Sequence, residues 1–334
     1  MLVVIAFVLA PLAAVALIVM LVRTGQAADR PLTATATAAR QHAGLTTALA
    51  VLAGALALPV GMLGTRSTSG LAVGLATGLL PALAGLAFLG VHAIGEATWP
   101  RPAGQVRRAS LERRTIRDLA PRLGLTAVAT WTTGLVVALL GFGLAADATG
   151  RTVSVTFENG GSTASPFPGW FYGLPLLGAT ALVLAATWGT LHLVATRPAV
   201  ADAAPRWDVA LRRLSAHRVL RGAQTVLGLT LVGVLGVAGR ALHSAGSGGS
   251  VDGVPRVDAL ASSTGTVVMV CAVAVLLATL AVGVVPGTPA SLGAERPAGD
   301  SPPSDLPRPA APPAPPAQPL PPAPPPTSAP STAS

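Results

Sequence analysis

The residues best suited to chemistry in this sequence are two histidines and a glutamate close to the ends of apolar runs. In GVHAIGEATWPRP, residues 90–102, His92 and Glu96 are spaced i,i+4, so their side chains lie on one face of a helix. His192 lies at a similar depth in a later run. Imidazole and carboxylate groups suit a transition metal such as zinc. One hypothesis is therefore a metal site formed by His92, Glu96 and His192, with His42 at the same depth.

Three other interpretations of these residues stay open. The groups could relay protons, because ionisable side chains within a membrane often have a function. They could form a structural hydrogen-bond cluster, or they could be unconnected residues at the interface, where polar groups cost little. The neighbouring residues favour this last interpretation: Trp99 suits an interfacial aromatic belt, and Arg101-Pro102 is typical of a helix leaving a membrane. No haem or other cofactor is expected.

Helical phase predicts that these side chains face protein rather than lipid. Gly74 precedes His92 by five full turns and so lies at the same angle. It belongs to a GxxxGxxxG ridge, the usual surface for close contact between helices in lipid, made of Gly70, Gly74 and Gly78. His192 shares a stripe with small residues of its own helix, namely Gly178, Ala181 and Ala185. Both histidines are therefore expected inside the protein.

The composition indicates that membrane spans hold these residues. Charged residues make up 10% of the 334 residues and hydrophobic residues 51%, whereas roughly a quarter of the residues in soluble domains are charged. Cys271 is the only cysteine, so there is no internal disulfide and no cysteine-based metal cage. The sequence has no phosphate loop, HExxH motif, nucleophile elbow or pair of carboxylates within a span. The protein is therefore not expected to be an enzyme.

Seven apolar runs are long enough to cross the hydrocarbon layer, which takes about 20 residues for about 30 Å. Each must be helical, because lipid offers no partner to free backbone groups. The sequence therefore predicts an all-α transmembrane bundle over residues 1–286, with spans near 2–22, 44–64, 71–94, 123–145, 170–195, 219–239 and 263–285. The first run could instead be a cleaved signal peptide, which would leave six spans.

The distribution of arginine predicts the orientation of the bundle. Three alternate connections, the last extended to Arg221, contain 16 arginines, whereas the other three connections contain 4. Basic residues gather on the cytoplasmic side, so the N-terminus is expected outside and the C-terminus inside. The net charge of +9 then belongs beside anionic lipid headgroups, and no nucleic-acid partner is expected.

The segments outside the spans suggest contacts with partners. Two arginine-rich inner loops, residues 105–124 and 205–220, predict amphipathic helices along the inner interface that could dock a membrane or cytoplasmic protein. On the outer side, RTVSVTFENGGS at residues 151–162 predicts a β-hairpin that turns at Asn159-Gly160-Gly161. The proline-rich stretch 287–334 predicts a disordered cytoplasmic tail.

Three stretches, GEATWPRP, PGWFYGLPLL and RRLSAHRVLRGAQ, resemble those of uncharacterised multi-pass membrane proteins from high-GC actinobacteria. The resemblance covers most of residues 1–285. It implies a place in a bacterial cytoplasmic membrane and implies no activity.

The sequence favours a non-enzymatic membrane component that assembles with partners. A small-solute permease or channel is the first alternative, and a metal- or proton-binding protein that uses the inner histidines is the second. The middle of every predicted span is almost free of ionisable groups. This pattern counts against an ion-coupled transporter, which usually needs charge near the membrane midplane.

Overall fold

The computed structural model describes residues 34–65, 70–99, 115–157, 160–200, 205–251 and 254–284, all of them within one compact unit, Met1–Leu292. The predicted span at 2–22 and the predicted tail at 287–334 lie outside the described residues.

Six helices in the described part of the chain are long and apolar enough to cross a membrane. They are α2 (Ala34–Thr65), α3 (Leu71–Ala97), α5 (Arg122–Ala145), α6 (Trp170–Thr196), α7 (Pro205–Ser247) and α8 (Ala259–Val284). A single turn of helix, α4 (Ile116–Leu119), precedes α5. The predicted all-α polytopic bundle is confirmed, and each of the last six predicted spans lies within one of these helices to within a residue at its ends.

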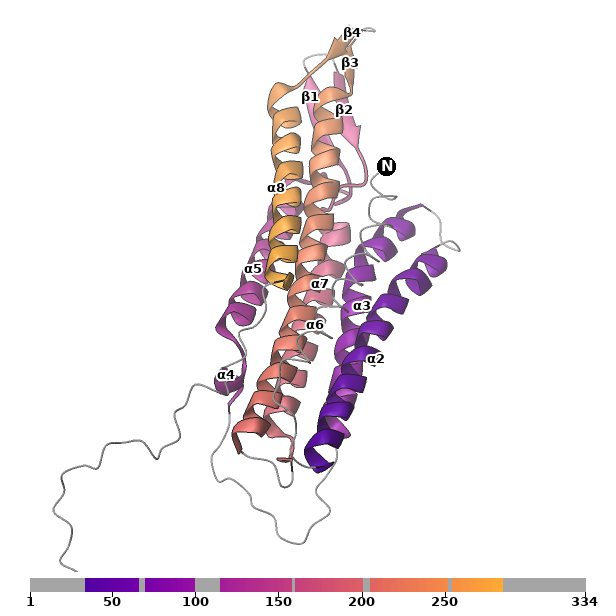
Figure 1. Cartoon of the computed structure of the whole chain (residues 1–334). Coiled ribbons are helices and arrows are strands. Elements are labelled where there is room, and N and C mark those ends of the chain that lie inside the picture. The colour runs from indigo at the N-terminus through magenta and orange to yellow at the C-terminus, as the bar shows by residue number, and fades with distance from the viewer. Residues whose placement is uncertain are drawn as a thin grey trace, which may run out of the picture. The chain divides into compact units, whose positions relative to one another are not determined.

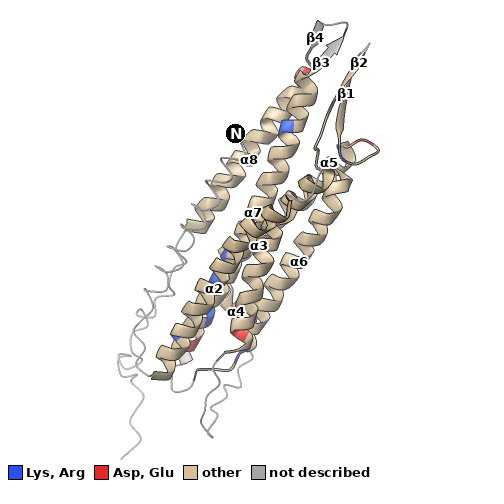
Figure 2. Cartoon of the chain, turned by 90° about the vertical axis from the view of Figure 1, so that its right-hand side faces the viewer, with Lys and Arg blue, Asp and Glu red and all other residues tan. Residues whose placement is uncertain are grey.

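Helix α7 occupies the centre of the bundle. It packs against α8, α5, α3 and α6, whereas α2 packs mainly against α3 (Figure 1). We call the end where α3 and α6 finish and α5 and α7 begin the arginine-rich end. The opposite end carries two small β-hairpins and is called the hairpin end. Most of the charged residues in the described helices gather toward the arginine-rich end (Figure 2).

One expectation about α7 is wrong. Residues 205–220 were expected to form a separate amphipathic helix along the interface, but they continue without a break into the predicted span to make one helix of 43 residues. At about 1.5 Å per residue this helix is about 65 Å long, twice the hydrocarbon thickness. Its first turns are buried in the bundle, because Asp208, Leu211, Arg212 and Ser215 are all almost inaccessible.

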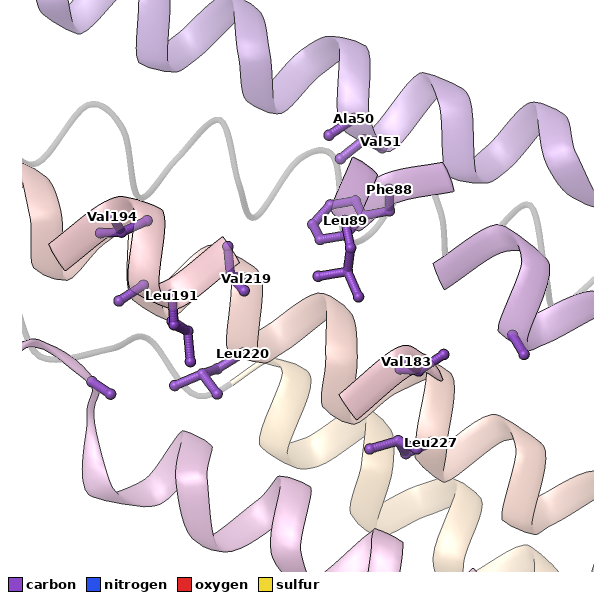
Figure 3. Close-up of a cluster of buried hydrophobic side chains, with 13 residues drawn as sticks. Ala50, Val51, Phe88, Leu89, Val183, Leu191, Val194, Val219, Leu220 and Leu227 are labelled. Atoms are coloured by element: carbon purple, nitrogen blue, oxygen red, sulfur yellow. The ribbon is translucent and has the colours of Figure 1, made fainter. Parts of the chain in front are cut away.

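An apolar cluster fills the middle of the bundle. Side chains from α2, α3, α6 and α7 point toward one another there (Figure 3). The largest fully buried members are Leu89, Leu220 and Leu227. Burying a side chain of this size contributes about 1.5–3 kcal/mol in water, but inside a bilayer its gain comes from close packing rather than from escape from water.

The hairpin predicted at residues 151–162 is present, but its turn was placed wrongly at Asn159-Gly160-Gly161, because Gly160 and Gly161 belong to the second strand. Strand β1 (Val153–Phe157) pairs antiparallel with β2 (Gly160–Ala164), and Phe157 faces Gly160 across the turn. A second hairpin, β3 (Gly249–Val251) with β4 (Val254–Arg256), was not predicted. Its signal is present in the sequence, because Asp-Gly at residues 252–253 between valines is a strong hairpin pattern.

The carboxylate of Asp147 holds the loop before β1 together by accepting several hydrogen bonds. Asp147 accepts hydrogen bonds from the backbone N–H groups of Thr149 and Thr152 and from both of their hydroxyls. Hydrogen bonds from the side chains of Thr152 and Thr149 lower the pKa of Asp147 from 3.8 to about 2. The carboxyl group therefore stays ionised to a lower pH in the folded loop than in the unfolded chain.

This lowered pKa predicts a pH dependence. A carboxyl group whose pKa is depressed by folding stabilises the loop fully above its unfolded pKa, and that stabilisation is lost as the pH falls from about 4 through about 2. At pH 5 we expect the Thr149 and Thr152 amides to exchange hydrogen more slowly than the same amides in an unfolded peptide. At pH 2 this protection, again measured against an unfolded peptide, should be smaller. In Asp147→Ala the protection should be low at both pH values, and a pH step that survives in this variant would contradict the assignment.

Candidate functional site

The most unusual group in the described residues is a buried ion pair at the arginine-rich end. Arg197 follows the last residue of α6, and its Nη1 donates to Oε2 of Glu96 on α3 at 2.9 Å. Their side chains are 1% and 4% exposed. The pair connects two helices that are far apart in the sequence, and it needs both partners, because an unpaired charge in such a place costs several kcal/mol.

An aromatic pair covers this ion pair. The guanidinium carbon of Arg197 lies 3.6 Å from the centroid of the Trp99 ring, a cation–π contact. His42 of α2 packs edge-on against the same ring, with centroids 5.4 Å apart, and its Nε2 is 2.9 Å from the carbonyl oxygen of Gly95. Trp99 was expected in an interfacial aromatic belt, but it is buried and joins α2 to the segment after α6.

A second buried arginine enters the same region from α7. Nη1 of Arg218 donates to the hydroxyl of Thr47 on α2 at 2.9 Å, and that hydroxyl in turn donates to the carbonyl of Ala43. Arg218 is also close enough to Glu96 for their charges to interact. Glu96 is therefore bonded to Arg197 and also carries the negative charge nearest in effect to Arg218.

His92 is buried next to this group rather than within a set of ligands. Its ring packs edge-on against Phe88, with centroids 4.7 Å apart, and Arg218 is its charged neighbour. The prediction that His92 and Glu96 face protein is confirmed, because both residues are buried.

A third arginine holds the end of α6. Arg212 pairs with Asp208 at 2.8 Å, and its other nitrogens donate to the carbonyl oxygens of Val194, Ala195 and Arg197. The last carbonyl groups of a helix have no partner within the helix, so this side chain satisfies three acceptors at once. It also fixes the backbone from which Arg197 reaches Glu96.

The structure does not assemble the hypothetical metal site of His92, Glu96 and His192. His192 is exposed, and so are Gly178, Ala181 and Ala185, the small residues of its stripe. The expectation that His192 faces protein is therefore wrong, because this face of α6 points away from the described helices. Among the described residues, no three His, Cys, Asp or Glu side chains stand close enough to hold a metal ion. Glu96 is instead paired with arginine.

The glycine ridge of α3 behaves as predicted over part of its length. A methyl group on Gly74 would touch the ring of Tyr172 on α6, and one on Gly85 would come within 2.8 Å of Val226 on α7. Gly70 lies before the helix and has a φ of 61°, a conformation that favours glycine. These close approaches bring α3 against α6 and α7, and so place Glu96 beside Arg197.

A separate polar contact ties α5 and α8 to α7. Nε1 of Trp131 donates to Oε1 of Gln224 at 3.0 Å, and Nε2 of Gln224 lies 3.4 Å from the carbonyl oxygen of Thr279. Gln224 is 1% exposed. Hydrogen bonds of this kind hold helices together where water is absent.

An apolar cavity of about 330 Å³ lies toward the hairpin end, between α3, α6, α7 and the segment before α6. Leu75, Pro81, Phe167 and Val234 are among its walls, and Thr77, Tyr172 and Thr230 supply its few polar groups. The central apolar cluster separates this cavity from the buried arginines. Along α3 the order is cavity at 74–81, cluster at 82–89 and the buried polar residues His92 and Glu96, and α6 likewise runs from the cavity through the cluster to Arg197.

Comparisons with known proteins add no relative. No protein-family model, no curated protein and no solved structure matches this chain.

Sequence reasoning missed the arginines as site residues. Arg197 and Arg212 were assigned to topology and to an interfacial helix, although both are buried and paired. A signal was available, because Asp208 and Arg212 are spaced i,i+4 between two apolar runs. Nothing in the sequence alone links Arg197 to Glu96, 101 residues earlier.

Proposed function

We propose that this protein is a non-enzymatic component of a bacterial cytoplasmic membrane that assembles with partners inside that membrane, with its arginine-rich end in the cytoplasm. The six apolar helices make it a multi-pass membrane protein by length and composition. The observation that carries the proposal is an uncovered row of small residues on α6, which we call the α6 stripe. It consists of Gly178, Ala181, Ala185 and Gly189, all exposed.

The α6 stripe has the form of a helix-packing surface. Its members are three or four residues apart, which is the spacing that lets two helix backbones approach closely in lipid. A methyl group on Gly178 or Gly189 would meet nothing within 4 Å in the described part of the chain. The comparable small residues of α3 already have partners, because the ridge residue Gly74 packs against α6 and Gly85, further along the helix, packs against α7. A flat surface of small residues leaves dispersion contacts with another helix unmade until that helix packs on it.

The middle of the bundle supports a component rather than a permease. A solute moving between the cavity and the arginine-rich end would have to pass through the apolar cluster around Leu89 and Leu227, whose side chains point toward one another between the helices (Figure 3). Transporters usually place charged or polar groups at that depth. The orientation rests on the gathering of arginine at one end (Figure 2) and on the rule that basic residues remain in the cytoplasm.

Photo-crosslinking in the native membrane tests the proposal. A benzophenone amino acid at Leu182, exposed beside the α6 stripe, should give a discrete adduct with a neighbouring membrane protein. The same group at Leu277, equally exposed on α8, is the position control. Ala181→Leu puts a large side chain on the stripe and should abolish the adduct, whereas Ala274→Leu, exposed on α8, should leave it intact.

Two results would count against the proposal. If Leu182 yields no discrete adduct, or if Ala181→Leu leaves the adduct unchanged, the α6 stripe faces only lipid. Solute flux in vesicles that requires the purified protein would favour the permease instead. A tightly packed middle predicts no such flux for small polar solutes.

A further inference from the structure

The apolar cavity at the hairpin end is only partly enclosed, and its mouth lies between α3 and α7. Thr77 of α3 and Gly233 and Val237 of α7 line the cavity and are exposed. Phe167 and Leu176 form its inner wall and are buried. The exposed faces of membrane-spanning helices contact acyl chains, so in a bilayer the mouth meets lipid. The volume of about 330 Å³ is within the range of about 300–1,000 Å³ found for ligand pockets.

One buried polar group of the cavity wall, the hydroxyl of Tyr172, has no partner in the described part of the chain. Tyr172 is 6% exposed. Its ring packs edge-on against Phe171 and its backbone N–H donates to the carbonyl of Gly169, but its hydroxyl makes no hydrogen bond to a described residue. Thr230, the other buried polar residue of the wall, donates its hydroxyl to the carbonyl of Val226. A buried tyrosine hydroxyl usually has an acceptor, and leaving it without one costs free energy.

The Tyr172 hydroxyl lies at the end of the cavity nearest the hairpins. A methyl group on Gly74, in the first turn of α3, would lie 3.3 Å from the hydroxyl oxygen. From Gly74 the wall of α3 continues to Pro81, which is about 10 Å deeper along the helix at about 1.5 Å per residue. A second, more open hollow, lined by Ser165 among others, shares Tyr172 with the cavity. A ligand that fits these features has a hydrogen-bond acceptor near the helix ends and an apolar chain below it.

We propose that the cavity holds one acyl chain of a membrane phospholipid, and that the ester carbonyl of this chain accepts a hydrogen bond from the hydroxyl of Tyr172. The ester carbonyls of phospholipids lie just below the headgroups, at the depth of the first turns of α3 and α6. A mouth that faces lipid lets a chain enter sideways while its headgroup stays at the interface. The apolar cluster closes the inner end, so the chain is held rather than passed on. This inference goes beyond the proposed function, because the cavity does not include the α6 stripe.

Photolabelling of the full chain in detergent micelles tests the proposal. The probe is a diester phosphatidylglycerol with a diazirine in one acyl chain, added at rising mole fraction, and mass spectrometry locates the adducts. Labelling of residues 74–81 and 229–237 should saturate, whereas labelling around Val270, exposed on α8, should rise in proportion to the probe. Labelling at the cavity that does not saturate overturns the proposal. So does the absence of labelling there, the result expected if another part of the chain, such as residues 2–22, fills the cavity.

A diether analogue of the same probe isolates the hydrogen bond to Tyr172. It has the same chains and headgroup but no ester carbonyl, so half-saturation should need about two- to tenfold more of it, the effect of losing one hydrogen bond. In Tyr172→Phe, which removes only the hydroxyl, the two probes should reach half-saturation at the same mole fraction. Equal behaviour of the two probes in the parent protein, or a preference that persists in Tyr172→Phe, would overturn the assigned contact.

Gly78→Leu tests whether the cavity itself is the site. The Cβ atom of a side chain at this position would lie 3.8 Å from Leu176, another residue of the cavity wall, so the leucine extends into the cavity and should remove the saturable labelling. Gly90→Leu adds the same side chain to α3 outside the cavity, where no described atom lies within 4 Å of the new Cβ, and should keep the labelling. Saturable labelling that survives in Gly78→Leu contradicts the proposal. If Gly78→Leu does not fold, the comparison of diester and diether probes in the parent protein and in Tyr172→Phe still decides.

Discussion

Glu96→Gln is expected to destabilise the bundle by about 3–5 kcal/mol, because it removes one partner of a buried ion pair and leaves the other charged. In the parent protein this carboxylate is hydrogen-bonded to Arg197, and its charge also acts on the buried Arg218. Without it both charges are buried with no counter-charge from Glu96. Unfolding in mixed detergent, followed by the fluorescence of the tryptophans, measures the loss, since Trp99 lies directly against Arg197.

A double variant distinguishes lost charge balance from lost packing. In Glu96→Leu with Arg197→Leu the cluster keeps the net charge that it has in the parent, so most of the stability should return, as when a buried pair is replaced by apolar residues. Asp118→Asn removes an exposed acid near the same end and weakens only the cap of α4, where Asp118 accepts from Thr115, so it should cost about 1 kcal/mol or less. A double variant that is less stable than Glu96→Gln would contradict this account.

The helices were predictable from the sequence to the extent that their own residues are apolar. The runs at 71–94 and 123–145 became α3 and α5 almost residue for residue. The first four turns of α7 were not predictable as part of the buried bundle, because Asp208, Arg212 and Arg218 are charged. Their burial depends on partners contributed by other helices, including Thr47 and the carbonyl groups at the end of α6.

The site was predictable only where helical phase and packing agree. Small residues mark the buried face of α3, so the inward position of His92 and Glu96 followed from Gly74. The same reasoning failed for His192, because the small residues of α6 form an exposed stripe. Small residues identify a surface that permits close contact, but they do not say whether the partner is within the same chain.

The second large effect is expected at the contact between α7 and α8. A methyl group on Gly265 would clash with the backbone nitrogen of His243 and would come within 2.6 Å of the carbonyl oxygen of Gly239. Both are backbone atoms of α7, so no side chain can move aside to make room. Gly265→Ala must therefore push the two helices apart, and we expect a loss of about 3 kcal/mol or more, at the upper end for overpacked sites.

A matched glycine on α7 shows whether the clash or the loss of glycine itself is responsible. Gly236 has nothing in the described part of the chain within 4 Å of where a methyl group would lie, so Gly236→Ala should be neutral or should stabilise the helix by about 0.5–1 kcal/mol. If the free energy of unfolding falls in Gly265→Ala but does not fall in Gly236→Ala, measured by the same unfolding assay, the close contact between the backbones of α7 and α8 stabilises the position of α8. Equal small effects would mean that α7 and α8 lie farther apart in the membrane. The contact between Gln224 and Thr279 depends on the same close approach of α8 to α7. It should therefore be weaker in Gly265→Ala than in the parent protein.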